Sequence, residues 1–142
     1  SIEDVGLANP DSQRQVLDSW SSYEKLGSPE GDIALAMSVI ALSLSPKSNA
    51  VYLAEKESKK FAKKHNSEQP PKHILNSSTA LMDTFGYGVG YKYDHDSKGG
   101  FSGQNYFPDG FKRPIFYHPV ERGYERELKK RISYFSKLRN KI

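Results

Sequence analysis

The stretch Gly86–Asp96, with the sequence GYGVGYKYDHD, is the part of this chain whose residue types come nearest to a phosphate-binding loop. Such a loop runs through a lysine and a Ser or Thr into a helix, so that backbone N–H groups and the lysine hold a polyphosphate. Here Lys92 lies between two tyrosines and is followed by Asp94. The dinucleotide-binding pattern fails too, because these glycines follow a helix-like segment and lack the spacing of its third glycine. The stretch therefore does not predict a nucleotide pocket.

The cluster Asp94, His95 and Asp96 could bind a metal ion or exchange protons, because carboxylates and imidazole do both near neutral pH. Adjacent side chains point in divergent directions, however, and no paired histidine motif supports a site. His73 and His118 lie far away in the sequence. We therefore favour the interpretation in which the aspartates cap a turn around an interfacial His95.

Aromatic residues are dense between 87 and 118, where nine of the chain's seventeen lie. Interleaved with lysine, as at Tyr91–Tyr93, such rings could stack on the bases of single-stranded nucleic acid. They could also pack this long segment against the helices and so keep it ordered. We favour packing. The nine are Tyr87, Tyr91, Tyr93, Phe101, Tyr106, Phe107, Phe111, Phe116 and Tyr117.

Composition limits the class of protein. The chain has 142 residues, a mass of 16.0 kDa and 36% hydrophobic content, which suits one domain with a core. Because it begins with Ser1 and both methionines are internal, we expect a piece of a longer protein. The absence of cysteine excludes disulfides and thiolate chemistry, and no serine lies in a nucleophile motif. With neither a signal peptide nor a membrane-spanning run, the expected location is the cytoplasm.

Charge is unevenly distributed along the chain. Residues 1–54 hold three basic and seven acidic residues, a net of −4, whereas residues 121–142 hold eight basic and three acidic residues, a net of +5. This pattern indicates either a basic segment that binds nucleic acid or an acidic face that meets a basic face, within the fold or between subunits. In the first case Lys129, Lys130 and Arg131 are the candidate phosphate contacts. A solvated helix face is the plainer alternative.

Start and stop signals place five helices, over 10–26, 29–44, 46–65, 77–85 and 120–139. The first three begin where a proline follows Asn or Ser, since the side chain caps free N–H groups and proline needs no partner there. The first two, joined by a short turn at Gly27, should be antiparallel neighbours. The second has an apolar stripe of Ile33, Met37, Ile40, Ala41 and Leu44. With an ordered loop region over 87–118, in which short strands would fit, this predicts a single all-α domain.

Five blocks along the chain carry recognisable residues. The first two are Glu3–Pro10 and Gly27–Gly31. The other three contain Pro46, Lys47, Ser48, Asn49 and Tyr52, then Gly86, Tyr87, Gly88, Tyr91, Tyr93, His95 and Asp96, and lastly Pro119, Arg122 and Gly123. In this order they resemble the C-terminal region of the RarA/MgsA family, replication-associated recombination ATPases of the AAA+ class related to the Werner-helicase-interacting protein. Leu75 and Ser78 depart from the family pattern, which has an arginine and a proline there.

The resemblance implies an all-helical domain like the collar of clamp-loader subunits, which assembles the parent protein into a homotetramer. It also implies a role at stalled or damaged replication forks, in the nucleoid, with DNA and single-strand-binding protein as partners and no membrane. The catalytic motifs of the family, with their ATP and Mg²⁺, belong to an ATPase core outside this chain. No catalytic, cofactor-binding or metal-binding residue of the family is therefore expected in this chain.

The primary hypothesis is thus a homo-oligomerisation domain, with the acidic and basic ends of the chain meeting across a symmetric interface. The alternative is a nucleic-acid-binding module that uses the basic final helix. Neither hypothesis makes the chain an enzyme by itself.

Overall fold

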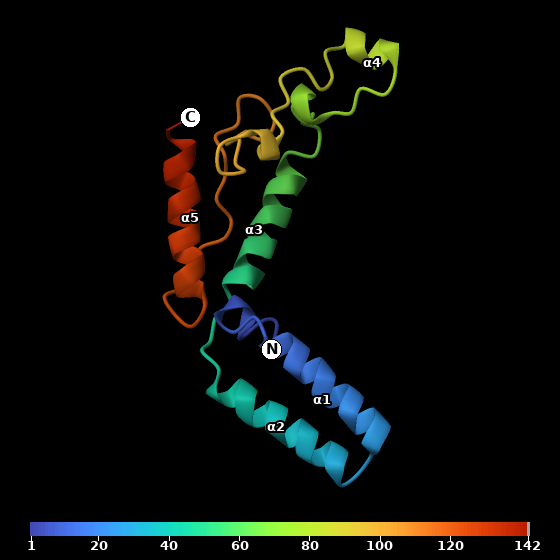
Figure 1. The fold of residues 1–142 in the computed structure, drawn as a ribbon, viewed down its shortest axis with the longest axis vertical. Coiled ribbons are helices and arrows are strands. Elements are labelled where there is room, and N and C mark those ends of the chain that lie inside the picture. Colours follow the sequence, from blue (N-terminus) through green and yellow to red (C-terminus); the bar gives the residue numbers. More distant parts are fainter. Residues whose placement is uncertain (142) are drawn as a thin grey trace. The chain divides into compact units, whose positions relative to one another are not determined.

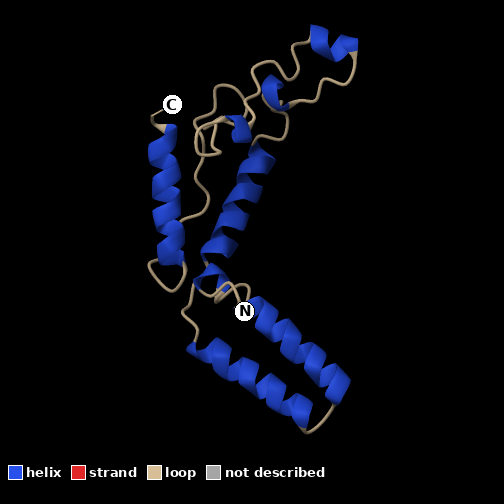
Figure 2. Cartoon of the chain, viewed as in Figure 1, coloured by secondary structure: helices blue, strands red, loops and turns tan. Residues whose placement is uncertain are grey.

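The computed structural model describes residues 1–141 and contains five α-helices in this part of the chain. They are α1 (Ser12–Leu26), α2 (Glu30–Leu44), α3 (Ala50–Lys64), α4 (Ala80–Thr84) and α5 (Glu125–Arg139). Three 3₁₀ turns accompany them: η1 (Gly6–Ala8), η2 (Lys72–Ile74) and η3 (Asp94–Asp96). Figure 2 shows helices and loops and no strand among the described residues. The all-α prediction is confirmed, and the segment 87–118 holds none of the strands that its composition allowed.

The chain divides into two compact units. Unit 1 comprises Ser1–Lys60 and Phe116–Ser133, and unit 2 comprises Phe61–Ile115 and Tyr134–Ile142. The division falls within α3 and within α5, so each of these helices contributes residues to both units. Each unit has its own set of packing contacts.

Three of the helices begin several residues later than the start signals predict: α3 at Ala50 instead of 46, α4 at Ala80 instead of 77, and α5 at Glu125 instead of 120. At α4 the cap is the Thr79 side chain, which accepts a hydrogen bond from the Met82 N–H at 3.3 Å. At α3 the backbone N–H of Ser48 donates to the Asp4 carbonyl at 2.8 Å, which keeps the residues before Ala50 out of the helix. At α3 a tertiary partner therefore displaced the local start signal, whereas at α4 a later local cap replaced it.

Helices α1 and α2 form an antiparallel hairpin, as predicted from the short turn between them (Figure 1). Their contact face consists of small residues, because Ser19 and Ser38 are buried and the Ser38 hydroxyl donates to that of Ser19 at 2.6 Å. Gly31 of α2 lies so close to α1 that a Cβ added to it would stand 2.7 Å from the Tyr23 Cα. The two backbones thus approach closely, and the larger side chains of α2 are left to point elsewhere.

Unit 2 is held together by aromatic rings. The ring of Phe61, on α3, lies 6.0 Å from Phe107 and 5.9 Å from Phe111, in edge-to-face arrangements. Phe101 lies 5.1 Å from Phe135 of α5, and the Arg139 guanidinium stacks over the Phe101 ring at 5.1 Å. Such contacts contribute about 0.5–1.5 kcal/mol each beyond burial. They agree with the packing interpretation of the aromatic segment.

Candidate functional site

Three segments that are distant in sequence meet in unit 1, and we call their meeting point the junction: residues 4–9, 45–49 and 120–125. Its centre is Glu125, the first residue of α5, which has no solvent exposure. The Glu125 carboxylate accepts hydrogen bonds from the Ser48 hydroxyl at 2.8 Å and from the Val120 N–H at 2.6 Å. The Asn9 amide also donates to the Ser45 hydroxyl, at 3.1 Å.

The close approach of Gly123 to the N-terminal segment completes the junction. A Cβ at Gly123 would stand 2.0 Å from the Ala8 carbonyl oxygen and 2.7 Å from the Pro46 ring, and its φ is +51°. The same carbonyl accepts a hydrogen bond from the Tyr124 N–H at 2.9 Å. Pro46, Ser48 and Gly123, three of the residues that carry the family resemblance, therefore contribute to packing at the same place.

The electrostatics of the junction favour a structural role for it. Burial, and then the negative charge of Glu125, raise the pKa of the Tyr117 hydroxyl. Among residues 1–141, no group makes a hydrogen bond of ordinary geometry with the Tyr117 hydroxyl, although the Glu125 carboxylate is close enough to affect its pKa. The Glu125 carboxylate is buried and already accepts two hydrogen bonds, so it is not accessible to a substrate. Glu125 is not among the site residues that the sequence predicts, because the burial of a charged residue at a helix start is visible only in three dimensions.

The glycine-rich stretch lies in unit 2 and is bound to its own surroundings. The Gly88 N–H donates to the Lys72 carbonyl at 2.9 Å. The side chain of Gln104 bridges the stretch, accepting from the Lys92 N–H and donating to the Gly90 carbonyl, each at 2.9 Å. Hydrogen bonds within unit 2 thus already occupy the Gly88 and Lys92 N–H groups, which are the kind of donor that a phosphate would need. The role of Gln104 had no signal in the sequence.

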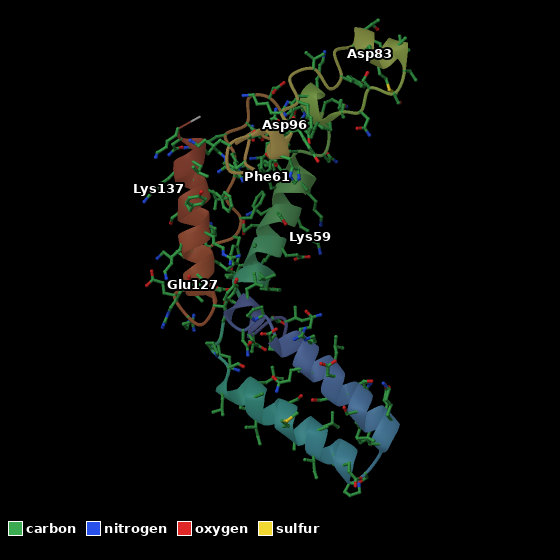
Figure 3. All side chains as sticks on the ribbon, viewed as in Figure 1. Lys59, Phe61, Asp83, Asp96, Glu127 and Lys137 are labelled. Atoms are coloured by element: carbon green, nitrogen blue, oxygen red, sulfur yellow. The ribbon has the colours of Figure 1, made fainter. Side chains whose placement is uncertain are left out.

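Residues Asp94, His95 and Asp96 form the turn η3, on which Asp96 is labelled in Figure 3. Asp94 accepts a hydrogen bond from the Ser102 N–H at 2.7 Å. Hydrogen bonds from the side chain and the backbone of Ser102 lower the pKa of Asp94. Within residues 1–141, no three His, Cys, Asp or Glu side chains are grouped so that they could hold a metal ion. The geometry agrees with a capped turn.

The remaining residues that carry the family resemblance lie in unit 2 or are at least partly exposed in unit 1. In unit 2 the Tyr93 ring lies 4.9 Å from that of His95, and Tyr87 lies 6.1 Å from Phe85, whereas Tyr91 is exposed. In unit 1 the exposed or half-buried ones are Lys47, Asn49, Tyr52, Pro119 and Arg122. The lysine ammonium of Lys47 donates to the Leu42 carbonyl at 2.6 Å, at the end of α2.

The three candidate phosphate contacts on α5 already have local partners. Lys129 pairs with Glu121, which lowers the pKa of that carboxyl group. Lys130 pairs with Glu127 at 2.6 Å, and Glu127 is labelled on α5 in Figure 3. The Arg131 guanidinium lies 5.9 Å from the centre of the Tyr124 ring. Exposed pairs of this kind are worth about 0–1 kcal/mol, so they compete only weakly with other ligands.

The outer face of α2 presents large apolar side chains to solvent. Four of them, which we call the α2 stripe, are Ile33, Met37, Ile40 and Leu44, with 68%, 56%, 61% and 82% of their surface exposed. On α1, Leu17, Trp20 and Leu26 are more than half exposed as well. None of the helices in the described part of the chain is both long and apolar enough to cross a membrane. An apolar surface of this extent is typical of a protein-binding site.

Comparison with known proteins identifies the family. Residues 1–136 match the family model described as "MgsA AAA+ ATPase C terminal". The chain is 37% identical to replication-associated recombination protein A of Coxiella burnetii, over 96% of the chain and 31% of that protein. It is 40% identical to the protein of that name from Haemophilus influenzae, over 92% of the chain and 29% of that protein. It is also 27% identical to ATPase WRNIP1 of Dictyostelium discoideum, over 81% of the chain and 13% of that protein.

The chain thus spans less than a third of the length of these relatives. The match runs through all three segments of the junction and through the glycine-rich stretch, which are among the blocks that carry the resemblance in the sequence. The all-helical fold agrees with it. The chain belongs to the family of MgsA AAA+ ATPase C-terminal domains.

Proposed function

We propose that this chain is the self-association domain of an AAA+ ATPase that acts in replication-associated recombination, and that its copies assemble into a homotetramer. The observation that carries the proposal is the exposed apolar surface of the α1–α2 hairpin. Large exposed apolar patches are uncommon on monomeric proteins and mark interaction sites.

The exposed area is of the size that an interface requires. If each side chain buries roughly 100 Å², the α2 stripe with Leu17, Trp20 and Leu26 offers about 700 Å² per copy. A stable interface buries about 800 Å² per partner. The exposed apolar side chains of the hairpin together approach this area, and a second copy is the occupant with a matching apolar surface in a symmetric assembly.

The proposal extends to the parent protein through the names of the relatives. The proteins called replication-associated recombination protein A match over nearly all of this chain. We infer that this domain works beside an ATPase core that holds ATP and Mg²⁺, in DNA repair at stalled forks in the nucleoid, with DNA and single-strand-binding protein as partners. In this proposal the chain itself performs no catalysis.

Measurement of the mass in solution tests self-association. The chain should be larger than a monomer at about 10 µM, and the variant Ile40→Glu should be monomeric. A carboxylate forced into an apolar interface costs several kcal/mol, and each 1.4 kcal/mol is about tenfold in the dissociation constant. Because Ile40 is exposed, the variant should keep its helical circular dichroism.

The matched control is Gln13→Glu, which makes the same charge change at an exposed polar position of α1. It should associate like the unmodified chain. A monomeric unmodified chain at this concentration would contradict the proposal. Equal association of the two glutamate variants would show that the α2 surface is not involved.

A further inference from the structure

The α2 stripe has the spacing of a helix-pairing seam. Its members are separated by four, three and four residues, so they lie in one row along a helix of 3.6 residues per turn. The contact with α1 uses Ser38 and Gly31, which belong to a different face of α2. The stripe therefore remains available for a second helix crossing at about 20°.

Charges mark the two ends of this seam with opposite sign. Glu30 and Asp32 lie in the first turn of α2, and the helix contains no Lys or Arg. Lys47 follows the helix, and its ammonium group donates to the Leu42 carbonyl at 2.6 Å, so a positive charge lies at the last turn. The helix dipole adds partial charges that a partner helix of opposite direction would complement.

We propose that α2 packs against α2 of a second copy in antiparallel orientation, about a two-fold axis that passes between positions 38 and 39. In this register Ile33 faces the partner's Leu44, and Met37 faces the partner's Ile40. The acidic first turn then lies opposite the partner's Lys47. This inference rests on the proposed self-association and specifies its surface, direction and register.

A parallel pair is disfavoured by the same charges. It would bring Glu30 and Asp32 of both copies together at one end and both Lys47 ammonium groups together at the other. Like charges across an interface are unfavourable, and they select against the wrong arrangement. An antiparallel pair forms two copies of the same opposite-charge contact, as two-fold symmetry requires.

Introduced cysteines test the register, because the chain has none of its own. The variants Ile33→Cys and Leu44→Cys, mixed and oxidised, should form a disulfide-linked dimer. Ile33→Cys alone should not, because its two copies would lie about 16 Å apart along the axis, at about 1.5 Å per residue. A disulfide needs Cα atoms within about 7 Å of each other.

The outcomes separate this inference from the function on which it rests. If the chain self-associates and Ile33→Cys links to itself, the pair is parallel and the inference is wrong. If the chain self-associates and no combination links, α2 does not form the seam, although the proposed function stands. If the chain is monomeric, both fail.

Charge reversal gives a second, independent readout. Glu30→Lys and Lys47→Glu should each raise the dissociation constant of the homodimer about tenfold, since two like-charged pairs replace two opposite ones. An equal mixture of the two variants should regain the original affinity, because each copy then opposes the charge of the other. Failure of the mixture to associate better than either variant would overturn the antiparallel arrangement.

Discussion

Replacing Gly123 by alanine should destabilise unit 1 severely. The added Cβ would stand 2.0 Å from the Ala8 carbonyl oxygen and 2.9 Å from its carbon, and these are backbone atoms that cannot turn away as a side chain can. Relief of the contact must separate the N-terminal segment from the start of α5. That movement would break the hydrogen bond from the Tyr124 N–H to Ala8, which is 2.9 Å long.

The magnitude follows from three contributions. A left-handed backbone costs a residue with a Cβ about 1–2 kcal/mol, overpacking costs about 1–3 kcal/mol, and the lost hydrogen bond costs about 0.5–1.5 kcal/mol. We therefore expect a loss of about 3–6 kcal/mol. Domains of this kind have only about 5–15 kcal/mol of stability, so the loss is a substantial share of it.

Gly27→Ala is the matched control. Gly27 also has a positive φ, +66°, with a ψ of −165° that residues other than glycine rarely adopt, but no atom lies within 4 Å of the position of its Cβ. Both variants change the unfolded chain in the same way, so a loss at Gly123 beyond the loss at Gly27 reports the contact with Ala8. We expect Gly27→Ala to lose about 1–3 kcal/mol through the backbone alone.

Urea unfolding monitored by the fluorescence of Trp20 measures both losses, because this single tryptophan lies on α1 in unit 1. Gly123→Ala should lose about 2 kcal/mol more unfolding free energy than Gly27→Ala at equal protein concentration. Equal losses for the two glycine variants would refute the reasoning, since the steric contact would then contribute nothing.

Two other predictions concern α5. Glu125→Ala should lose about 2–5 kcal/mol of unfolding free energy in the same assay, because the buried Ser48 hydroxyl and the Val120 N–H lose their acceptor. Glu125→Gln retains an acceptor oxygen and should lose less. An equal loss for the two variants would contradict the role of Glu125 as an acceptor. Replacing Lys129, Lys130 and Arg131 together by alanine should leave any affinity for single-stranded DNA nearly unchanged, because in the proposed function the chain acts through the α1–α2 hairpin and not through the basic face of α5. A fall in affinity with a flatter salt dependence would instead favour the nucleic-acid-binding alternative.

The helices could be predicted from local chemistry, but several of their starting points could not. A Ser-Pro or Asn-Pro signal acts through neighbouring residues and so indicates that a helix is near. At α3 the start moved to Ala50 because Ser48 bonds to Asp4 and Glu125, which lie 44 and 77 residues away. Partners this far away in the sequence cannot be identified from a local sequence pattern.

The sequence by itself determined the all-helical class, the antiparallel pairing of α1 with α2 and the family, because periodicity, turn residues and ordered motif blocks are local properties of the chain. Only the tertiary structure decided which face of α2 is buried. The apolar stripe could have been a core face, but close packing at Gly31 and Ser38 placed the small residues inside and left Ile33, Met37, Ile40 and Leu44 in solvent. Burial depends on which surfaces fit together, and that fit is a property of two helices in contact, not of either helix alone.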